Sequence, residues 1–363
     1  MDAKLFSDRS FNLSGKGLSI LLVGGLLLVS LFLDFQAGRS LIQGMTLPLA
    51  SSAVLTAVVG SWAVPMLRAL KAGQVIREDG PQAHLKKAGT PTMGGVFFIP
   101  VAVFLAVLLS GFDANVIAVS ALTLAYAAIG LLDDWQIIRR KSNKGISPRM
   151  KLSLQILFGS LFCLWMSQNA TLDLAKLVLP FGWVLPLSFL FLPIALFALV
   201  AESNATNLTD GLDGLAGGTV AIALMGLSAL VAPTAPGLMI FCACLSGSCL
   251  GFLSHNRHPA RVFMGDTGAL ALGGALAAVA LLTQHLFALL VLSGLFLVET
   301  LSVMAQVSYY KATKGSDGIG RRLFKMSPFH NHLELSGWSE IQIVGTFYLS
   351  GLFLVFFCLA IYA

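Results

Sequence analysis

Long apolar segments separated by short polar loops dominate this chain. A helix needs about 20 mostly apolar residues to cross a bilayer, and small flanking residues extend the shorter segments to that length. Eleven segments are candidate spans: 17–33, 47–70, 96–109, 115–132, 152–166, 185–201, 215–232, 238–253, 270–282, 286–306 and 341–362. We therefore predict an all-α, polytopic integral membrane protein. The composition agrees, because 11% of the residues are charged, against about 25% in soluble domains.

The first segment could be mistaken for a secretory signal. Its apolar stretch, residues 17–33, is longer than the roughly 7–15 residues of a typical signal core, and no good cleavage site follows it. We predict an uncleaved span.

Positive charge is concentrated on one side of the predicted spans. If the spans alternate, five loops share a side: 71–95, 133–151, 202–214, 254–269 and 307–340. With their flanks and the amino-terminal segment, they hold 21 of the 23 Lys and Arg residues. Short positive loops remain in the cytoplasm, so we predict a cytoplasmic amino terminus and an outer carboxyl terminus. This topology explains the net charge of +6. Nucleic-acid binding is not needed to explain that charge, and no basic run is interleaved with aromatic residues as in single-strand binding proteins.

Carboxylates in these loops are the first candidates for chemistry. Asp133 and Asp134 follow an apolar segment, where the helix carboxyl terminus disfavours each anion by about 0.3–1 kcal/mol. A bound cation or a proton-transfer role would offset that cost, whereas two solvated acids at the interface are the alternative. Asp266 precedes another span and could bind Mg²⁺, which takes one or two carboxylates plus substrate phosphates. Alternatively, Asp266 or Thr267 is simply a helix N-cap.

A polar repeat lies in the loop 202–214. Asn207, Asp210 and Asp213 recur every three residues and would share a face if this stretch is helical. Gly211 would let a ligand approach the backbone closely. A plain turn between two spans is the alternative.

A possible anion site opens the span at 96–109. Residues 90–95 read TPTMGG and follow Lys87, and a helix amino terminus near an ammonium group suits an anion. An ordinary start of a span would look the same.

The last polar loop contains two histidines. His330 and His332 are two residues apart, so in an extended loop they would point to one side and could bind phosphate or donate protons. Surface histidines without a role are the alternative. Upstream, Glu299 lies within an apolar segment, about seven residues or roughly 10 Å from its cytoplasmic end. A carboxylate there costs about 2.5–3.5 kcal/mol, so we expect a polar partner.

Several motifs together resemble one enzyme family. They are TPTMGG, the pair Asp133-Asp134, NLTDGLDG at 207–214, FMGDTG at 263–268, ETLSVMAQV at 299–307, and the histidine loop. From about residue 73 to 338 the chain resembles phospho-N-acetylmuramoyl-pentapeptide transferases, a branch of the polyprenyl-phosphate sugar-1-phosphate transferases. This resemblance implies ten spans, a homodimer and an active site on the cytoplasmic face of the bacterial inner membrane. Segment 17–33 is additional, so we predict an amino-terminal extension at 1–45 and a transferase domain at 46–363.

The resemblance also implies a reaction and roles for residues. Phospho-MurNAc-pentapeptide would pass from UDP-MurNAc-pentapeptide to undecaprenyl phosphate, giving lipid I and UMP, with Mg²⁺ as cofactor. Asp266 would bind the metal and Asp133 or Asp134 would activate the lipid phosphate, with His330 and His332 also catalytic. The substrate pocket would contain Lys87, Thr92, Asn207, Asp210, Gly211, Leu212, Asp213, Asn256, Phe263 and Gln306, with Phe263 stacked on uracil.

One departure concerns the histidine loop. The family usually has three consecutive histidines, whereas the middle position here is Asn331. Because asparagine cannot supply a proton near pH 7, that position is not expected to be the essential acid.

Three alternatives compete with this interpretation. A secondary transporter would place its binding groups near the midplane on broken helices, whereas most polar candidates here lie in loops on one face. A sister transferase using UDP-N-acetylglucosamine would share the aspartates and magnesium, but TPTMGG and the loop after Arg321 argue against it. A structural scaffold would not need carboxylates beside basic loops.

Overall fold

The structure, a computed structural model, describes residues 14–70, 87, 89–140, 142, 144–169 and 176–362. The predicted amino-terminal positive segment, residues 1–13, and most of loop 71–95 lie outside the described residues. The long helices are α1 (Gly15–Gln36), α2 (Thr46–Ala69), α3 (Gly95–Leu109), α4 (Ala114–Arg140), α5 (Pro148–Asn169), α6 (Phe191–Thr209), α7 (Leu215–Val231), α8 (Pro236–Asn256), α9 (Gly265–Leu282), α11 (Gly294–Ala312) and α13 (Glu340–Tyr362). The short elements are β1 (Lys176–Val178), η2 (Pro180–Gly182), β2 (Val184–Pro186), η3 (Ser188–Leu190), α10 (Leu286–Leu292) and α12 (Phe329–Glu334).

The predicted apolar segments are largely helical, although segment 185–201 begins in β2, so the all-α membrane prediction is confirmed. Among the described residues, eight helices are long and apolar enough to cross a membrane, or nine if α10 and α11 form one bent span. α3 and α7 are apolar but shorter, with 15 and 17 residues. In a bilayer, an apolar stretch satisfies its backbone hydrogen bonds by forming a helix.

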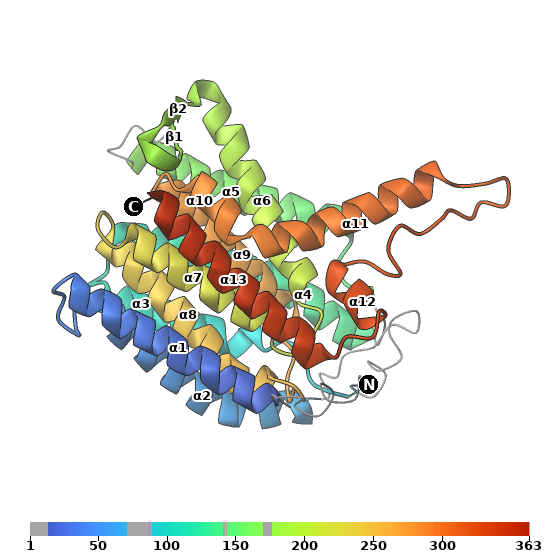
Figure 1. The fold of residues 1–363 in the computed structure, drawn as a ribbon, viewed down its shortest axis with the longest axis horizontal. Helices are drawn as coiled ribbons and strands as arrows, with labels where there is room; N and C mark the ends of the chain where they lie inside the picture. Colours follow the sequence, from blue (N-terminus) through green and yellow to red (C-terminus); the bar gives the residue numbers. More distant parts are fainter. Residues whose placement is uncertain are drawn as a thin grey trace, which may run out of the picture.

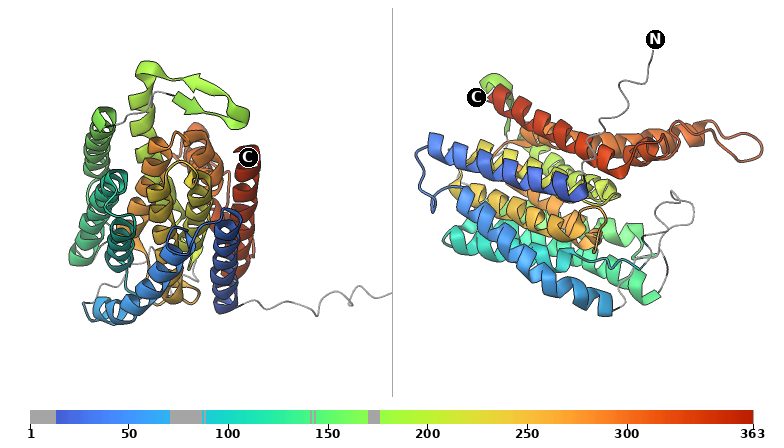
Figure 2. Two further views of the ribbon diagram at one scale, coloured as in Figure 1. Left: turned by 90° about the vertical axis from the view of Figure 1, so that its left-hand side faces the viewer. Right: turned by 60° about the horizontal axis from the view of Figure 1, so that its bottom comes forward.

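The predicted single span at 286–306 is interrupted. It breaks at Ser293 into α10 and α11, which meet at an angle of 74°. A Ser-Gly pair lies at the break, a common place for a helix kink. The Ser293 hydroxyl donates to Glu202 Oε1 of α6 at 2.5 Å. Beyond the break, α11 and the chain after it project from the bundle (Figures 1 and 2).

The centre of the bundle contains α7, α8 and α9. In α8 and α9, 89% and 83% of the residues in the most apolar stretch are buried. Gly247 and Gly251 bring α8 against α2, because an added Cβ would lie 2.1 Å from Leu49 O and 2.3 Å from Ala53 O. Small residues allow such close backbone contacts between helices in membranes. The outer helices α1, α2, α5 and α6 expose large apolar side chains, a surface suited to lipid.

Helix α1, the additional segment, packs against α2, α7, α8 and α13. Asp34 near its end is buried and accepts hydrogen bonds from the Met45 N–H at 3.1 Å, the Thr46 N–H at 2.9 Å and the Thr46 hydroxyl at 2.6 Å. These bonds cap the amino terminus of α2 with a carboxylate from α1. The division into 1–45 and 46–363 remains a prediction.

A small hairpin follows α5 and provides the strands found in the described residues. β1 and β2 pair antiparallel, with Lys176 opposite Pro186. The Tyr362 hydroxyl donates to Val178 O at 3.0 Å, so the hairpin lies beside the last turn of α13. Figure 1 shows α12 at the other end of α13. The loop 202–214 lies at the same end, because Gly211 packs against His330 of α12.

Candidate active site

Gly130 brings the aspartate pair of α4 to the start of α9. A Cβ at Gly130 would lie 2.2 Å from the carbonyl carbon and oxygen of Asp266. Because glycine has no side chain, the two helices touch there. Asp133 and Asp134 follow one turn later, beside the first turn of α9. The pair predicted on one loop and Asp266 predicted on another are therefore brought together.

Asp134 caps α9. Its Oδ1 accepts the Asp266 N–H at 3.2 Å, and its Oδ2 accepts the Thr267 N–H at 3.0 Å and the Thr267 hydroxyl at 2.7 Å. The residue is 4% exposed. The alternative in which Asp266 or Thr267 is itself the N-cap is wrong, because a carboxylate from α4 satisfies the free N–H groups of α9.

Asp133 and Asp266 lie side by side. Asp133 Oδ1 accepts the Ile146 N–H at 3.0 Å, and its carboxyl group interacts directly with that of Asp266. Asp266 also accepts a hydrogen bond from Asn207 Nδ2 at 2.7 Å and forms an ion pair with Lys151 of α5. Four helices, α4, α5, α6 and α9, thus contribute side chains to one point.

Asp210 completes a group that we call the carboxylate cluster. Helix α6 ends at Thr209 and Asp210 takes a non-helical conformation, φ −78° and ψ 62°. Burial and the nearby carboxylates of Asp266 and Asp134 raise the pKa of Asp210 from its ordinary value of 3.8 to about 7. The cluster consists of Asp133, Asp134, Asp210 and Asp266. Several carboxylates around the single ammonium of Lys151 suit a hard divalent cation with oxygen ligands.

Asp213 lies outside this cluster. The helix ends at Thr209 and the chain turns at Gly214, whose φ is +81°. The expectation that Asn207, Asp210 and Asp213 share one helical face is therefore wrong. Asn207 and Asp210 face Asp266, whereas Asp213 faces another group of charges.

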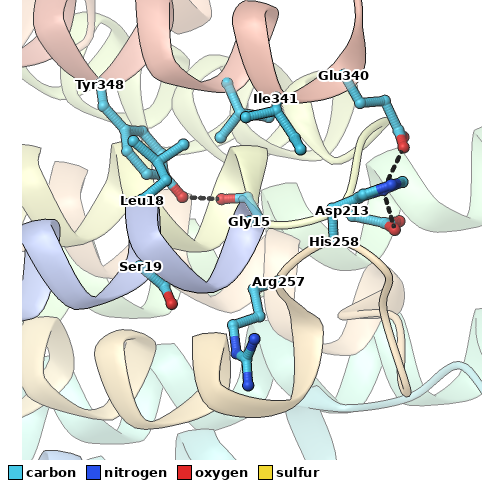
Figure 3. A pocket seen from close by; sticks show the side chains of 11 residues that line it. Gly15, Leu18, Ser19, Asp213, Arg257, His258, Glu340, Ile341 and Tyr348 are labelled. Atoms are coloured by element: carbon cyan, nitrogen blue, oxygen red, sulfur yellow. Dashed lines mark hydrogen bonds and ion pairs between the residues drawn. The ribbon is translucent and has the colours of Figure 1, made fainter. Parts of the chain in front are cut away.

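The second group, which we call the Asp213 network, joins four segments of the chain. Asp213 Oδ1 binds Lys87 Nζ at 2.8 Å, and its Oδ2 lies 3.2 Å from His258 Nδ1 and 2.9 Å from the Ala260 N. Glu340, at the start of α13, pairs with Lys87 and lies 2.6 Å from His258 Nδ1. Figure 3 shows His258 between the two carboxylates. The network ties the segment before α3 to α13.

The cation of the Asp213 network is Lys87. Ligand atoms of Asp213, His258 and Glu340 lie within 4.8 Å of one another, a spacing that a metal ion could use, but the Lys87 ammonium already bridges the two carboxylates. Burial by itself lowers the pKa of Lys87, but the carboxylates of Glu340 and Asp213 outweigh burial and raise it above 10.5. Lys87 therefore carries a full positive charge.

Two of the predicted substrate residues use their side chains to hold backbone. Asn256 accepts the Gly214 N–H at 3.0 Å and donates to Val262 O at 2.9 Å. Gln306 accepts the N–H groups of Leu323 and Phe324, each at 2.9 Å. Asn256 thus joins segments beside Asp213, whereas Gln306 holds the loop after α11 against that helix and lines a separate pocket with Tyr310 and Arg322.

The TPTMGG segment packs against the segment that contains Asp266. The Phe263 N–H donates to Pro91 O at 2.8 Å, and the Gly94 N–H donates to Phe263 O at 2.9 Å. Thr92 is buried, and a Cβ at Gly265 would lie 2.8 Å from its Oγ1. Phe263 is half-buried. Leu212, on the neighbouring turn, is buried.

The two histidines do not share a side. Residues 329–334 form the short helix α12 instead of an extended loop, so positions two apart point in different directions. His330 is buried, and its Nε2 would lie 2.1 Å from a Cβ at Gly211. His332 is half-buried and accepts the Lys325 N–H at 3.2 Å. Only His330 contacts the loop that carries Asp210.

Known proteins resemble this chain over its full length. The relative from Nostoc punctiforme, a phospho-N-acetylmuramoyl-pentapeptide-transferase, is 66% identical over 99% of this chain and 100% of its own. Relatives of the same name from Trichormus variabilis and Gloeothece citriformis are 66% and 60% identical, over 99% and 96% of both chains. The chain belongs to the phospho-N-acetylmuramoyl-pentapeptide-transferase family.

Two family models match parts of this transferase-family chain. The model described as glycosyl transferase family 4 matches residues 116–284, which include the whole carboxylate cluster. The model described as phospho-N-acetylmuramoyl-pentapeptide-transferase signature 1 matches residues 87–99, from Lys87 into α3. The family predicted from the motifs is confirmed.

Lys151, His258 and Glu340 were not expected at the site. Lys151 pairs with a carboxylate 115 residues away, and Glu340 pairs with a lysine 253 residues away. In sequence they resemble ordinary charges of cytoplasmic loops, and no local motif surrounds them. These three residues can be assigned to the site only once it is known which helices pack together.

Proposed function

We propose that this chain transfers phospho-MurNAc-pentapeptide from UDP-MurNAc-pentapeptide to undecaprenyl phosphate, forming lipid I and releasing UMP. The observation that carries the proposal is the convergence of Asp133 of α4, Asp266 of α9 and Asp210, which follows α6, beside the Lys151 ammonium. The family supports it, since its members carry the name of this transferase.

The chemistry requires charge compensation and alignment. An oxygen of the lipid phosphate attacks the sugar-bearing phosphorus of the donor, and the bond to the bridging oxygen breaks, so that UMP leaves. Both reactants are anions, so neutralisation and in-line positioning contribute most of the rate. Lys151 and Lys87 supply positive charge near the carboxylate cluster and the Asp213 network.

Of the two aspartates on α4, Asp133 is the better candidate base. Asp134 already accepts hydrogen bonds from Asp266 and Thr267, whereas Asp133 accepts one backbone N–H and otherwise faces Asp266. Asp133 would take the proton of the lipid phosphate. Asp134 would hold the first turn of α9, and with it Asp266, in place.

We propose that the carboxylate cluster binds Mg²⁺. Burial raises the pKa of Asp210 most, and the carboxylates of Asp266 and Asp134 raise it further. A divalent cation would relieve the repulsion between these carboxylates. Asp266, with Asp133 and Asp210 beside it, would hold the ion through oxygen ligands. When bound, Mg²⁺ would neutralise the diphosphate of the donor.

We further propose that this end of the bundle faces the cytoplasm of the bacterial inner membrane. The support is the excess of Lys and Arg in the loops that meet there. The nucleotide would arrive from that side, while undecaprenyl phosphate would lie in the adjacent leaflet. A homodimer is proposed from the family resemblance alone.

The function is tested by UMP release. Purified protein in detergent is supplied with undecaprenyl phosphate, Mg²⁺ and either UDP-MurNAc-pentapeptide or UDP-N-acetylglucosamine. We expect UMP with the first donor only, and none when lipid is omitted. Release no greater than in the lipid-free control would reject the proposal, and release from UDP-N-acetylglucosamine would favour the sister transferase.

A further inference from the structure

Glu299 is a carboxylate buried in the apolar helix α11, and its exposed fraction is 0%. An ionised side chain at such a depth costs about 2.5–3.5 kcal/mol on insertion scales, so a partner is required. The partner is His330 of α12. Its backbone N–H donates to Glu299 Oε1 at 3.2 Å, and its Nδ1 lies 3.2 Å from Oε2.

The imidazole of His330 is held from two sides. Its side chain is 2% exposed, and Nδ1 faces the Glu299 carboxylate. The Nδ1 approach is not aligned as a hydrogen bond, so the backbone N–H provides the directional bond and the carboxylate provides the charge. On the opposite edge, Nε2 packs against Gly211, where an added Cβ would lie 2.1 Å away. Gly211 directly follows Asp210 of the carboxylate cluster.

We propose that Glu299 is a positioning residue for the transfer reaction: its buried carboxylate holds the His330 imidazole with Nε2 against the turn that carries Asp210. The inference rests on the proposed function. A carboxylate beside one ring nitrogen keeps the proton on that nitrogen and orients the ring.

Other charged groups nearby have different partners. Glu202 is a second carboxylate within the bundle, but it accepts from Ser293 at the break between α10 and α11. His332 accepts the Lys325 N–H and stacks near Phe324. Among the described residues, the contacts of the His330 ring place Glu299 at one edge and Gly211, which follows Asp210, at the other. Glu202→Gln is accordingly a matched control for removing a carboxylate from the bundle.

The test compares Glu299→Gln, His330→Gln, the double variant and Glu202→Gln, each purified and assayed with UDP-MurNAc-pentapeptide, undecaprenyl phosphate and Mg²⁺. Glutamine keeps an oxygen for the His330 N–H but removes the charge. We expect Glu299→Gln to lower kcat about 10–100-fold, the range for groups that orient a functional histidine, with the donor KM within twofold. Glu202→Gln should keep the wild-type kcat.

The double variant distinguishes positioning from a general structural role. If Glu299 acts through His330, the double variant is as slow as His330→Gln alone. Independent, multiplying losses would overturn the inference, as would a wild-type kcat in Glu299→Gln. If Glu299→Gln does not stay monodisperse, Glu299→Asp is used instead. It retains the charge with shorter reach, and we expect a reduced kcat with the donor KM within twofold, whereas an unchanged kcat would reject positioning. A wild-type protein that releases no UMP would reject the proposed function itself, whereas normal wild-type turnover with an unaffected Glu299→Gln would reject only this inference.

Discussion

Replacing each aspartate of the α4 pair by asparagine separates two roles that the sequence does not distinguish. Asp134 accepts hydrogen bonds from three donors at 3.2, 3.0 and 2.7 Å at the start of α9. Asparagine keeps one acceptor oxygen and turns an amide N–H toward another donor. Asp133 accepts the Ile146 N–H at 3.0 Å, and an amide oxygen can replace that bond.

The expected stability losses differ in size. Hydrogen bonds to a charged group contribute about 1.5–3 kcal/mol each, and loss of an N-cap costs about 0.5–2 kcal/mol. Because the three bonds share one carboxylate, we expect Asp134→Asn to cost about 2–4 kcal/mol in total. Asp133→Asn keeps its bond and relieves repulsion with Asp266, so we expect a change within about 1 kcal/mol.

The assay combines thermal unfolding with turnover. At about 2–4 °C per kcal/mol for chains of a few hundred residues, the unfolding midpoint of Asp134→Asn should fall by roughly 4–16 °C, and that of Asp133→Asn by no more than about 4 °C. Asp133→Asn should nevertheless lose about 10²–10⁴ in UMP release, the contribution of a positioned general base.

Two results would refute this reasoning. Equal midpoints for the two variants would mean that Asp134 does not cap α9 in the way the hydrogen bonds indicate. A folded Asp133→Asn protein with wild-type turnover would remove Asp133 as the base. Both measurements use detergent-solubilised protein with a chelator, so that bound metal does not mask the stability difference.

Three further outcomes follow from the geometry. Gly211→Ala should lower turnover at least tenfold, because its Cβ would collide with His330 Nε2; wild-type kcat would contradict that contact. Asp210 binds its proton more tightly in the folded protein, so wild-type protein in the presence of a chelator should lose stability as pH rises from about 4 to about 7. The unfolding midpoint of Asp210→Asn should decline less over that range. An identical decline in both proteins would contradict the raised pKa of Asp210. Lys87→Gln should raise the donor KM about tenfold or more through loss of a charged contact, measured by UMP release, whereas an unchanged KM would exclude Lys87 from donor binding.

The apolar segments could be predicted because the bilayer restricts their backbone. All eleven segments are largely helical, as expected where no water satisfies the backbone. Segment 185–201 nevertheless begins in β2, and 286–306 forms two helices. The break at Ser293 was not predicted, since the apolar run continues through it and the 74° bend depends on packing with Glu202. The helix at 329–334 was not predicted either, because the segment is short and polar and lies against Glu299.

The acids of the site could be predicted better than its bases. Asp133 was identified because a carboxylate near a helix carboxyl end is unfavourable without a cation or a proton. Asp210 was identified from the three-residue spacing of polar side chains, and Asp266 because a carboxylate before a span suits Mg²⁺. Lys151 and Glu340 could not be distinguished from topological charges, because their partners come from distant segments. The separation of Asp213 from Asp210 depends on the end of α6 at Thr209, which three-residue spacing does not show. The metal and substrate roles of these residues stay predictions.

Magnesium dependence of Asp266→Asn tests the central claim most directly. UMP release from UDP-MurNAc-pentapeptide is measured against Mg²⁺ concentration for the wild type, Asp266→Asn and Asp317→Asn, whose aspartate lies in the exposed loop after α11. We predict saturable magnesium dependence in the wild type and Asp317→Asn, and no turnover at any Mg²⁺ concentration in a folded Asp266→Asn protein. Wild-type turnover without Mg²⁺, or a wild-type magnesium curve in Asp266→Asn, would contradict a metal-dependent transfer at the carboxylate cluster.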